Sequence, residues 1–137
     1  MKSVTIISDD RVGLLADISY ILGKSSVNIE GLVVDVVGGR AVISLEVKDP
    51  KKAKDVLESN GFATARPDAI VIKVANSSVG KVTELLEGEK VHIQDMTTLS
   101  SDARTTVYAV NVDKPRKAAK MLAPFLIGND ANPDSFY

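Results

Sequence analysis

The sequence predicts an α+β protein built from two tandem β-α-β-β-α-β modules, each an antiparallel sheet with both helices on one face. Two observations indicate the duplication. The run Asp9–Gly13 follows an apolar strand, and a similar run, Asn76–Gly80, follows another one 67 residues later. A lysine-rich run after Pro50 returns after Pro115, 65 residues later. A repeat of this length is longer than a solenoid unit and matches one small domain.

Residues 1–66 form the first predicted module. Asp9 or Asp10 can cap its first helix, Gly23 favours a helix end, and Gly38-Gly39 indicates a tight hairpin. The expected elements are strands at 4–7, 32–37, 41–47 and 62–66 and helices at 12–22 and 51–59, the second capped by Asp49. One face of the first helix carries Val12, Leu15, Ile18 and Leu22, and one face of the third strand carries Ala41, Ile43, Leu45 and Val47.

Residues 67–137 form the second predicted module, with the joint at Pro67-Asp68. Its expected elements are strands at 69–74, 96–100 and 106–112, a helix at 81–86 and a second helix that ends near Pro124. The segment from Ile127 onward is a poor strand followed by a polar tail, so we expect the final strand to be short or missing. This order of elements is the ferredoxin-like arrangement.

Composition excludes several classes of function. The 137 residues are 45% hydrophobic with a net charge of −1, which argues against a general binder of nucleic acids or membranes. The chain has no Cys and a single His, His92, so we expect neither a metal site nor a cofactor. No apolar run has the length of a membrane span, and no signal-peptide pattern opens the chain, so we expect a cytoplasmic protein.

A motif occurs twice in the same order: a strand, Asp/Asn-x-x-Val-Gly, a helix, and then Val27-Asn28-Ile29 or Val91-His92-Ile93. In this order the sequence resembles the ACT domain family, whose small ferredoxin-like modules bind amino acids and regulate metabolic enzymes. The resemblance covers nearly the whole chain as two copies, and it is stronger in residues 1–66 than in 67–126. It implies a regulatory protein that binds an amino acid at clefts between ACT domains.

Elementary chemistry supports a ligand at these loops. A turn that ends in glycine brings backbone N–H groups close to a small anion, and the helix N-terminus after it favours negative charge. Both features suit the α-carboxylate of an amino acid. Its ammonium group needs an acceptor, which Asp9 or Asp10 provides in the first copy and Asn76 or Ser77 in the second.

The resemblance implies a site lined by this loop and by the segment that enters the second strand. Taken together, the candidate ligand-binding residues are Asp9, Asp10, Val12, Gly13, Leu14, Asn28 and Ile29 in the first copy and Asn76, Ser77, Val79, Gly80, Lys81, His92 and Ile93 in the second. The family often has Pro where Val12 and Val79 stand, and His92 replaces Asn28. Two alternatives stay open: the sites differ in ligand, or one is empty. The apolar residues Val12, Leu14 and Ile29 favour a branched or small neutral amino acid over a charged one.

Other functions find less support. RNA-recognition domains share this order of elements but stack bases on aromatic residues, which the strands at 4–7 and 41–47 lack. Asp9, Asp10 and Asp17 are a carboxylate cluster without a supporting His, Lys or Ser, so we expect no enzyme and no catalytic residues. The main alternative is a ligand-free interaction module that pairs through its sheet edges. We expect a homodimer, favoured by exposed Val33 and Val37, and a regulated partner enzyme.

Overall fold

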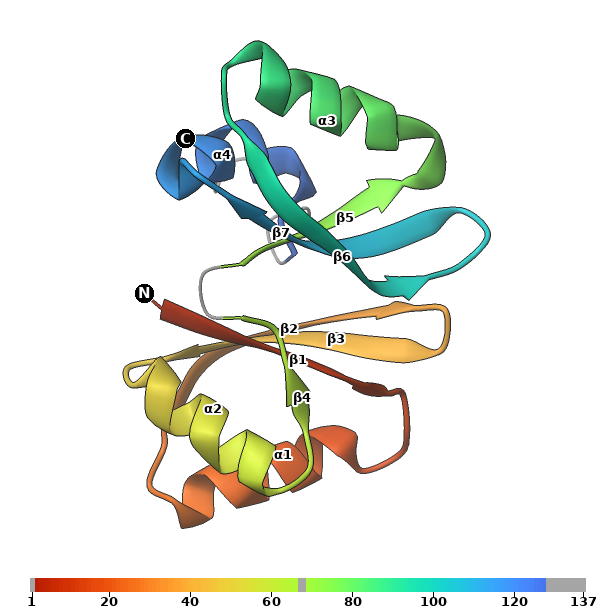
Figure 1. Cartoon of the computed structure of the whole chain (residues 1–137). Coiled ribbons are helices and arrows are strands. Elements are labelled where there is room, and N and C mark those ends of the chain that lie inside the picture. Colours follow the sequence, from red (N-terminus) through yellow and green to blue (C-terminus); the bar gives the residue numbers. More distant parts are fainter. Residues whose placement is uncertain (1, 67–68, 128–137) are drawn as a thin grey trace. The chain divides into compact units, whose positions relative to one another are not determined.

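The computed structural model (Figure 1) describes residues 2–66 and 69–127 and confirms the α+β class with two antiparallel sheets. The chain divides into two compact units, Met1–Pro67 (unit 1) and Asp68–Tyr137 (unit 2). The predicted joint at Pro67-Asp68 and the predicted polar tail from Gly128 lie outside the described residues.

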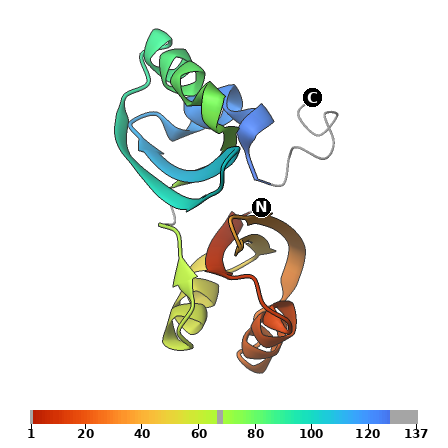
Figure 2. The ribbon, with the colours of Figure 1, turned by 90° about the vertical axis from the view of Figure 1, so that its right-hand side faces the viewer.

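Unit 1 contains six elements: β1 (Lys2–Asp9), α1 (Leu14–Lys24), β2 (Ile29–Val37), β3 (Arg40–Val47), α2 (Pro50–Ser59) and β4 (Ala63–Thr64). Its strands follow the order β2-β3-β1-β4, and every pair of neighbours is antiparallel. Both helices lie on one face of this sheet (Figure 2). The fourth strand was predicted to span 62–66 but pairs with β1 over only two residues.

The core of unit 1 fills the space between the sheet and its two helices. The predicted alternation in β3 is confirmed, because Ala41, Ile43, Leu45 and Val47 are all buried and belong to this core. α1 contributes Leu14, Ile18 and Leu22, one residue from each turn. Each large aliphatic side chain removed from water contributes about 1.5–3 kcal/mol. The remaining core residues come from β1, α2 and the α1–β2 loop: Val4, Ile6, Val27, Ala53 and Leu57.

The start of α1 differs from the prediction. Neither aspartate caps the helix; the N-cap is Gly13, at φ 84° and ψ 0°, and it makes no side-chain capping bond. This left-handed conformation is easy for glycine and costly for residues with a Cβ. The helix therefore starts at Leu14, and the side chain of Val12 is fully exposed. Gly23 lies inside the helix instead of ending it, since α1 runs to Lys24.

Other local predictions for unit 1 are confirmed. Gly38 and Gly39 form the β2–β3 turn, with φ angles of 60° and 75°. Asp49 caps α2 by accepting a hydrogen bond from the backbone N–H of Lys52 at 3.1 Å. The glycine turn closes the hairpin, and the Asp49 cap starts the second helix; each uses a residue suited to its conformation.

Unit 2 contains β5 (Ile70–Ala75), η1 (Asn76–Ser78), α3 (Val79–Gly88), β6 (Ile93–Ser101), β7 (Thr105–Val112), α4 (Pro115–Met121) and η2 (Ala123–Phe125). Its sheet has the order β5-β7-β6, and a bridge from Leu126 to Ile72 stands where unit 1 has its fourth strand. The core contains Ile70, Ile72, Val74, Val82, Leu86, Val91, Val110, Val112, Ala118 and Leu122. α3 begins two residues earlier than predicted, so Val79 and Gly80 are helical.

Strand β2 is an edge of its sheet and keeps an apolar surface. Leu32, Val34 and Val36 are 43%, 38% and 52% exposed. They pair with Leu45, Ile43 and Ala41, so they share the face that the helices occupy. Cross-strand partners project to the same side of a sheet. The helices therefore leave β2 partly uncovered. Val33 is also partly exposed, whereas Val37 is buried, contrary to the expectation.

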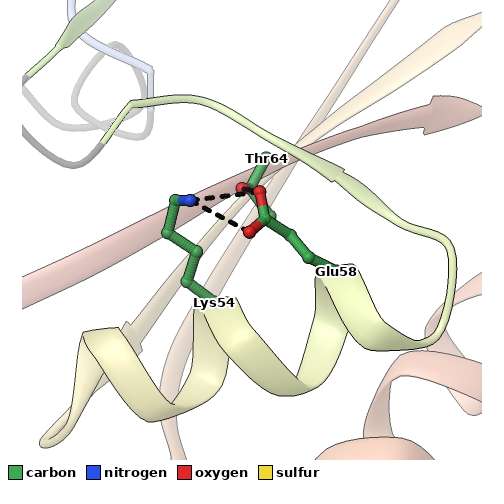
Figure 3. Close-up of polar contacts among 3 residues, drawn as sticks. All are labelled: Lys54, Glu58 and Thr64. Carbon is green, nitrogen blue, oxygen red and sulfur yellow. Dashed lines mark hydrogen bonds and ion pairs between the residues drawn. The ribbon is translucent and has the colours of Figure 1, made fainter.

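A polar cluster attaches the short strand β4 to α2 (Figure 3). Lys54 Nζ lies 3.1 Å from both carboxylate oxygens of Glu58, and Thr64 Oγ1 donates to Glu58 Oε2 at 2.8 Å. The Thr64 hydrogen bond, followed by Lys54, lowers the pKa of Glu58 below its usual value. Hydrogen bonds to the charged form and a nearby cation both favour the carboxylate.

We predict that Glu58→Gln lowers the thermal stability of the chain at pH 7 and has no effect once the pH is well below about 4, the usual glutamate pKa. A lowered pKa in the folded state means that the unfolded state binds more protons, so this contribution is present above the unfolded pKa and lost as pH falls. Melting temperatures of both proteins across pH 2–7 test this. Glu84→Gln, on α3, is the control; an equal pH-dependent difference in the control would contradict the assignment.

Candidate ligand site

The candidate site is the corner of unit 1 where β1 passes into α1. The backbone N–H of Asp10 donates to the carbonyl of Gly39 at 3.0 Å, which ties the loop to the β2–β3 turn. The chain then reverses through Gly13, whose carbonyl accepts the N–H of Asp17 at 2.9 Å. Strand pairing, a glycine turn and the first helical turn thus meet at one corner.

An open pocket of about 300 Å³ occupies this corner. Its residues come from the loop, from the first turn of α1 and from the helix-facing side of β2 and β3: Asp10, Arg11, Gly13, Leu14, Leu15, Ala16, Val34, Ala41 and Ile43. The loop supplies the charged groups, and the strands supply an apolar wall. Such a combination of apolar lining with a few polar groups is typical of small-molecule sites.

The charges around the pocket are arranged unevenly. Arg11 lies 2.8 Å from the carboxylate of Asp17, in an ion pair whose side chains are about half exposed. Within the described residues, no hydrogen bond or ion pair engages the carboxylate of Asp10. The first turn of α1 has no side-chain cap, and the unbonded N–H groups of a helix N-terminus favour an anion. The corner therefore offers a negative group and a positive helix end beside an apolar surface.

The structure brings together only some of the predicted residues of the first copy. Asp10, Gly13 and Leu14 line the pocket, and Asp9 ends β1 beside it. The exposed side chain of Val12 does not line it. Asn28 and Ile29 lie at the opposite end of β2, where Asn28 lines a separate pocket of about 240 Å³. Sequence reasoning missed Val34, Ala41 and Ile43, whose alternation indicated only a strand.

The corresponding corner of unit 2 is built differently. The N–H of Asn76 donates to the carbonyl of Arg104 at 2.8 Å, the counterpart of the bond from Asp10 to Gly39. The Asn76 side chain accepts a 2.6 Å hydrogen bond from Thr106 Oγ1 and donates to the carbonyl of Asp102 at 3.1 Å. Asn76 therefore joins the first turn of η1 to the β6–β7 turn.

The other predicted residues of the second copy are spread over the unit. Val79 packs on the core, Gly80 is the second residue of α3, and Ser77 and Lys81 are exposed. His92 and Ile93 line a pocket of about 410 Å³ at the far end of α3, together with Glu87, Lys90 and Val91. The structure thus separates His92 and Ile93 from the β5–α3 corner.

Backbone and lysine contacts organise this far end of unit 2. The N–H of His92 donates to Asp113 Oδ1 at 2.8 Å, and the N–H of Asp113 donates to the carbonyl of His92 at 3.1 Å. The ammonium groups of Lys114 and Lys117 donate to the carbonyls of Lys90 and Glu89, each at 2.9 Å. These bonds satisfy carbonyls that follow α3 and account for the positions of the two lysines.

Among the described residues, no group of three or more His, Cys, Asp or Glu side chains has the arrangement of a metal site. In the same part of the chain, no helix has both the length and the apolar character needed to cross a membrane.

No family model and no curated protein matches the chain. Among solved structures, a protein from Bacteroides thetaiotaomicron is 23% identical over 94% of this chain and 93% of its own, with a TM-score of 0.49. The ligand-free regulatory subunit of aspartate kinase from Thermus thermophilus is 14% identical over 87% and 88%, with a TM-score of 0.43. The acetolactate synthase small subunit from Thermotoga maritima is 13% identical over 98% and 87%, with a TM-score of 0.39. At these values the likeness carries no function over to this chain.

We predict opposite effects of one substitution at the two motif glycines. Gly13→Ala should destabilise unit 1 by about 1 kcal/mol, because an L residue in the left-handed region costs about 1–2 kcal/mol. Gly80→Ala should stabilise unit 2 by up to about 1 kcal/mol, since alanine favours a helix. A Cβ meets nothing within 4 Å at either position, so backbone preference decides both signs. Denaturant unfolding measures them, and equal signs would show that the two backbones do not differ as described.

Proposed function

We propose that this chain is a regulatory protein that binds a small amino acid at the β1–α1 corner of unit 1. The observation that carries the proposal is the pocket itself. It combines the Asp10 carboxylate with the uncapped start of α1 and an apolar wall from β2 and β3. The resemblance to ACT domains, read from the order of motifs, supports the same corner.

Each part of an α-amino acid has a partner in this corner. The ammonium group donates to the Asp10 carboxylate in a charge-assisted hydrogen bond. The α-carboxylate accepts from N–H groups in the first turn of α1, where the helix dipole favours negative charge. The side chain contacts Val34 of β2 and Leu15 of α1, which are 38% and 40% exposed. A pocket of about 300 Å³ is at the small end of the range for ligand sites and suits a ligand of this size.

Regulation follows if the ligand has different affinities for two arrangements of the protein or its assembly. The resemblance implies that a metabolic enzyme or a regulator responds to that change. It also implies a role for Asn28 and Ile29, which are far from the Asp10 loop within unit 1. A second copy of the chain can bring these two residues to the loop, so the proposal includes a homodimer.

The edge strand β2 supports this dimer. Edge strands with unpaired backbone groups and apolar side chains readily pair with another strand. β2 is nine residues long and exposes Val33 and Val36, and it ends one side of its sheet. Pairing of two β2 strands would cover this edge and extend the sheet across both copies.

We predict that one class of amino acid raises the melting temperature of the chain in a panel of all twenty. A ligand at one hundred times its dissociation constant stabilises the folded state by about 2.7 kcal/mol, which corresponds to several degrees. Asp10→Ala should remove this shift because the ammonium group loses its acceptor. The melting temperature of the free variant should stay close to that of the parent, since Asp10 is exposed.

Two results would contradict parts of this proposal. If Asp10→Ala and Asn28→Ala both keep the full shift, the site lies elsewhere. If the folded parent shows no shift with any amino acid, the amino-acid proposal fails and the ligand-free interaction module becomes the better reading.

We predict that Val33→Lys shifts the chain from dimer to monomer, because like charges on paired edges repel and lysine is a common blocker of edge strands. Size-exclusion chromatography with light scattering measures the molar mass of each variant. Val33→Thr is the control, since it keeps β-branching without adding charge. A parent chain that is monomeric at every concentration would exclude the homodimer.

A further inference from the structure

We infer that each chain binds one ligand, at the corner of unit 1 alone, and that this ligand is a neutral amino acid with an aliphatic side chain. This inference rests on the proposed function and goes beyond it by assigning different roles to the two corners. It follows from comparing the same positions of the two units through their strand registers.

The backbone fixes which residues correspond. In unit 1 the last β1–β3 pair is Asp9 with Arg40, and in unit 2 the last β5–β7 pair is Ala75 with Thr105. The residue after each strand donates its N–H to the facing turn, which makes Asn76 the counterpart of Asp10. Arg40 and Thr105 therefore correspond, and so do the residues that follow them, Ala41 and Thr106.

A chain of hydrogen bonds closes the unit 2 corner. Thr106 is 5% exposed, and its hydroxyl donates to Asn76 Oδ1 at 2.6 Å and lies 2.8 Å from Ser101 Oγ. The Asn76 amide group then donates to the backbone at Asp102. The group that corresponds to Asp10 is therefore already bonded within the protein. Freeing it for a ligand would leave a buried threonine hydroxyl without this partner, which is unfavourable.

The unit 1 corner lacks these hydroxyls. Ala41 stands where unit 2 has Thr106, and its neighbour across the strands, Val36, stands where unit 2 has Ser101. Deeper in the wall, the pair Val34 with Ile43 replaces Thr98 with Tyr108. Every strand residue of the wall is apolar, and Val34, at 38% exposed, is the one that presents its side chain to the pocket, since Ala41 and Ile43 are buried.

The lining also indicates the ligand's side chain. An apolar wall gives no partner to a charged or amide side chain, and burying such a group without a hydrogen bond is costly. Arg11, the remaining charged residue of the lining, is paired with Asp17. The exposed apolar lining formed by Val34 and Leu15 therefore suits an aliphatic side chain.

Calorimetric titration of the full chain with L-valine, L-leucine and L-isoleucine, each alone, tests the inference. We expect one equivalent bound per chain for at least one of them. Asp10→Asn, which removes the charge at constant size, and Val34→Thr, which puts a hydroxyl on the exposed wall at similar size, should each weaken binding about tenfold or more. The matched change in unit 2, Thr106→Ala, should lower the melting temperature and leave the affinity unchanged.

The outcomes separate this inference from the proposed function. Two equivalents per chain, or weaker binding by folded Thr106→Ala, would overturn the single site while amino-acid binding stands. Binding of a charged amino acid but none of these three would overturn the aliphatic class only. If none of the twenty amino acids binds, the proposed function and this inference both fail.

Discussion

The left-handed turn at Gly13 is the constraint on which the candidate site depends. It allows the chain to leave β1, remain tied to the hairpin by the hydrogen bond from Asp10 to Gly39, and still start α1 at Leu14. A helix that began directly after the strand would place its first turn where the loop now stands. Unit 2 takes that direct route, because η1 and α3 follow β5 without an intervening loop. The presence or absence of this turn therefore separates the two corners.

The second determinant is how two helices cover a four-stranded sheet. The core of unit 1 is centred on β1 and β3, whose inward residues are almost fully buried. The edge strand β2 extends beyond this cover, so Leu32, Val34 and Val36 keep exposed apolar surface. The same incomplete cover explains two features, the apolar wall beside the Asp10 loop and an edge suited to pairing. Exposed apolar surface of this kind commonly marks an interaction site.

Local patterns were enough to predict much of the fold. The alternation from Ala41 to Val47, the Gly38-Gly39 turn and the Asp49 cap depend on neighbouring residues and were all confirmed. The site could be predicted only in part. Its loop carries a motif, but the wall residue Val34 reaches the loop only through pairing with Ile43. The Gly38-Gly39 turn sets this register, but how far the helices cover β2, and so leave Val34 exposed, depends on packing between elements distant in the sequence.

The repeat itself explains why the first helix of the second copy begins earlier than predicted. Alignment of the two motifs pairs Gly80 with Gly13. The backbone hydrogen bonds instead make Asn76 the counterpart of Asp10, and Gly80 lies inside α3. Chain length between the strand and the helix differs, so equal motifs occupy different conformations. Because hydrogen bonds engage Asn76 and Thr106 in unit 2, the two modules do not present two equivalent corners. Cooperativity in such a protein would have to couple sites on separate copies of the chain, because coupling requires two sites that bias a shared equilibrium.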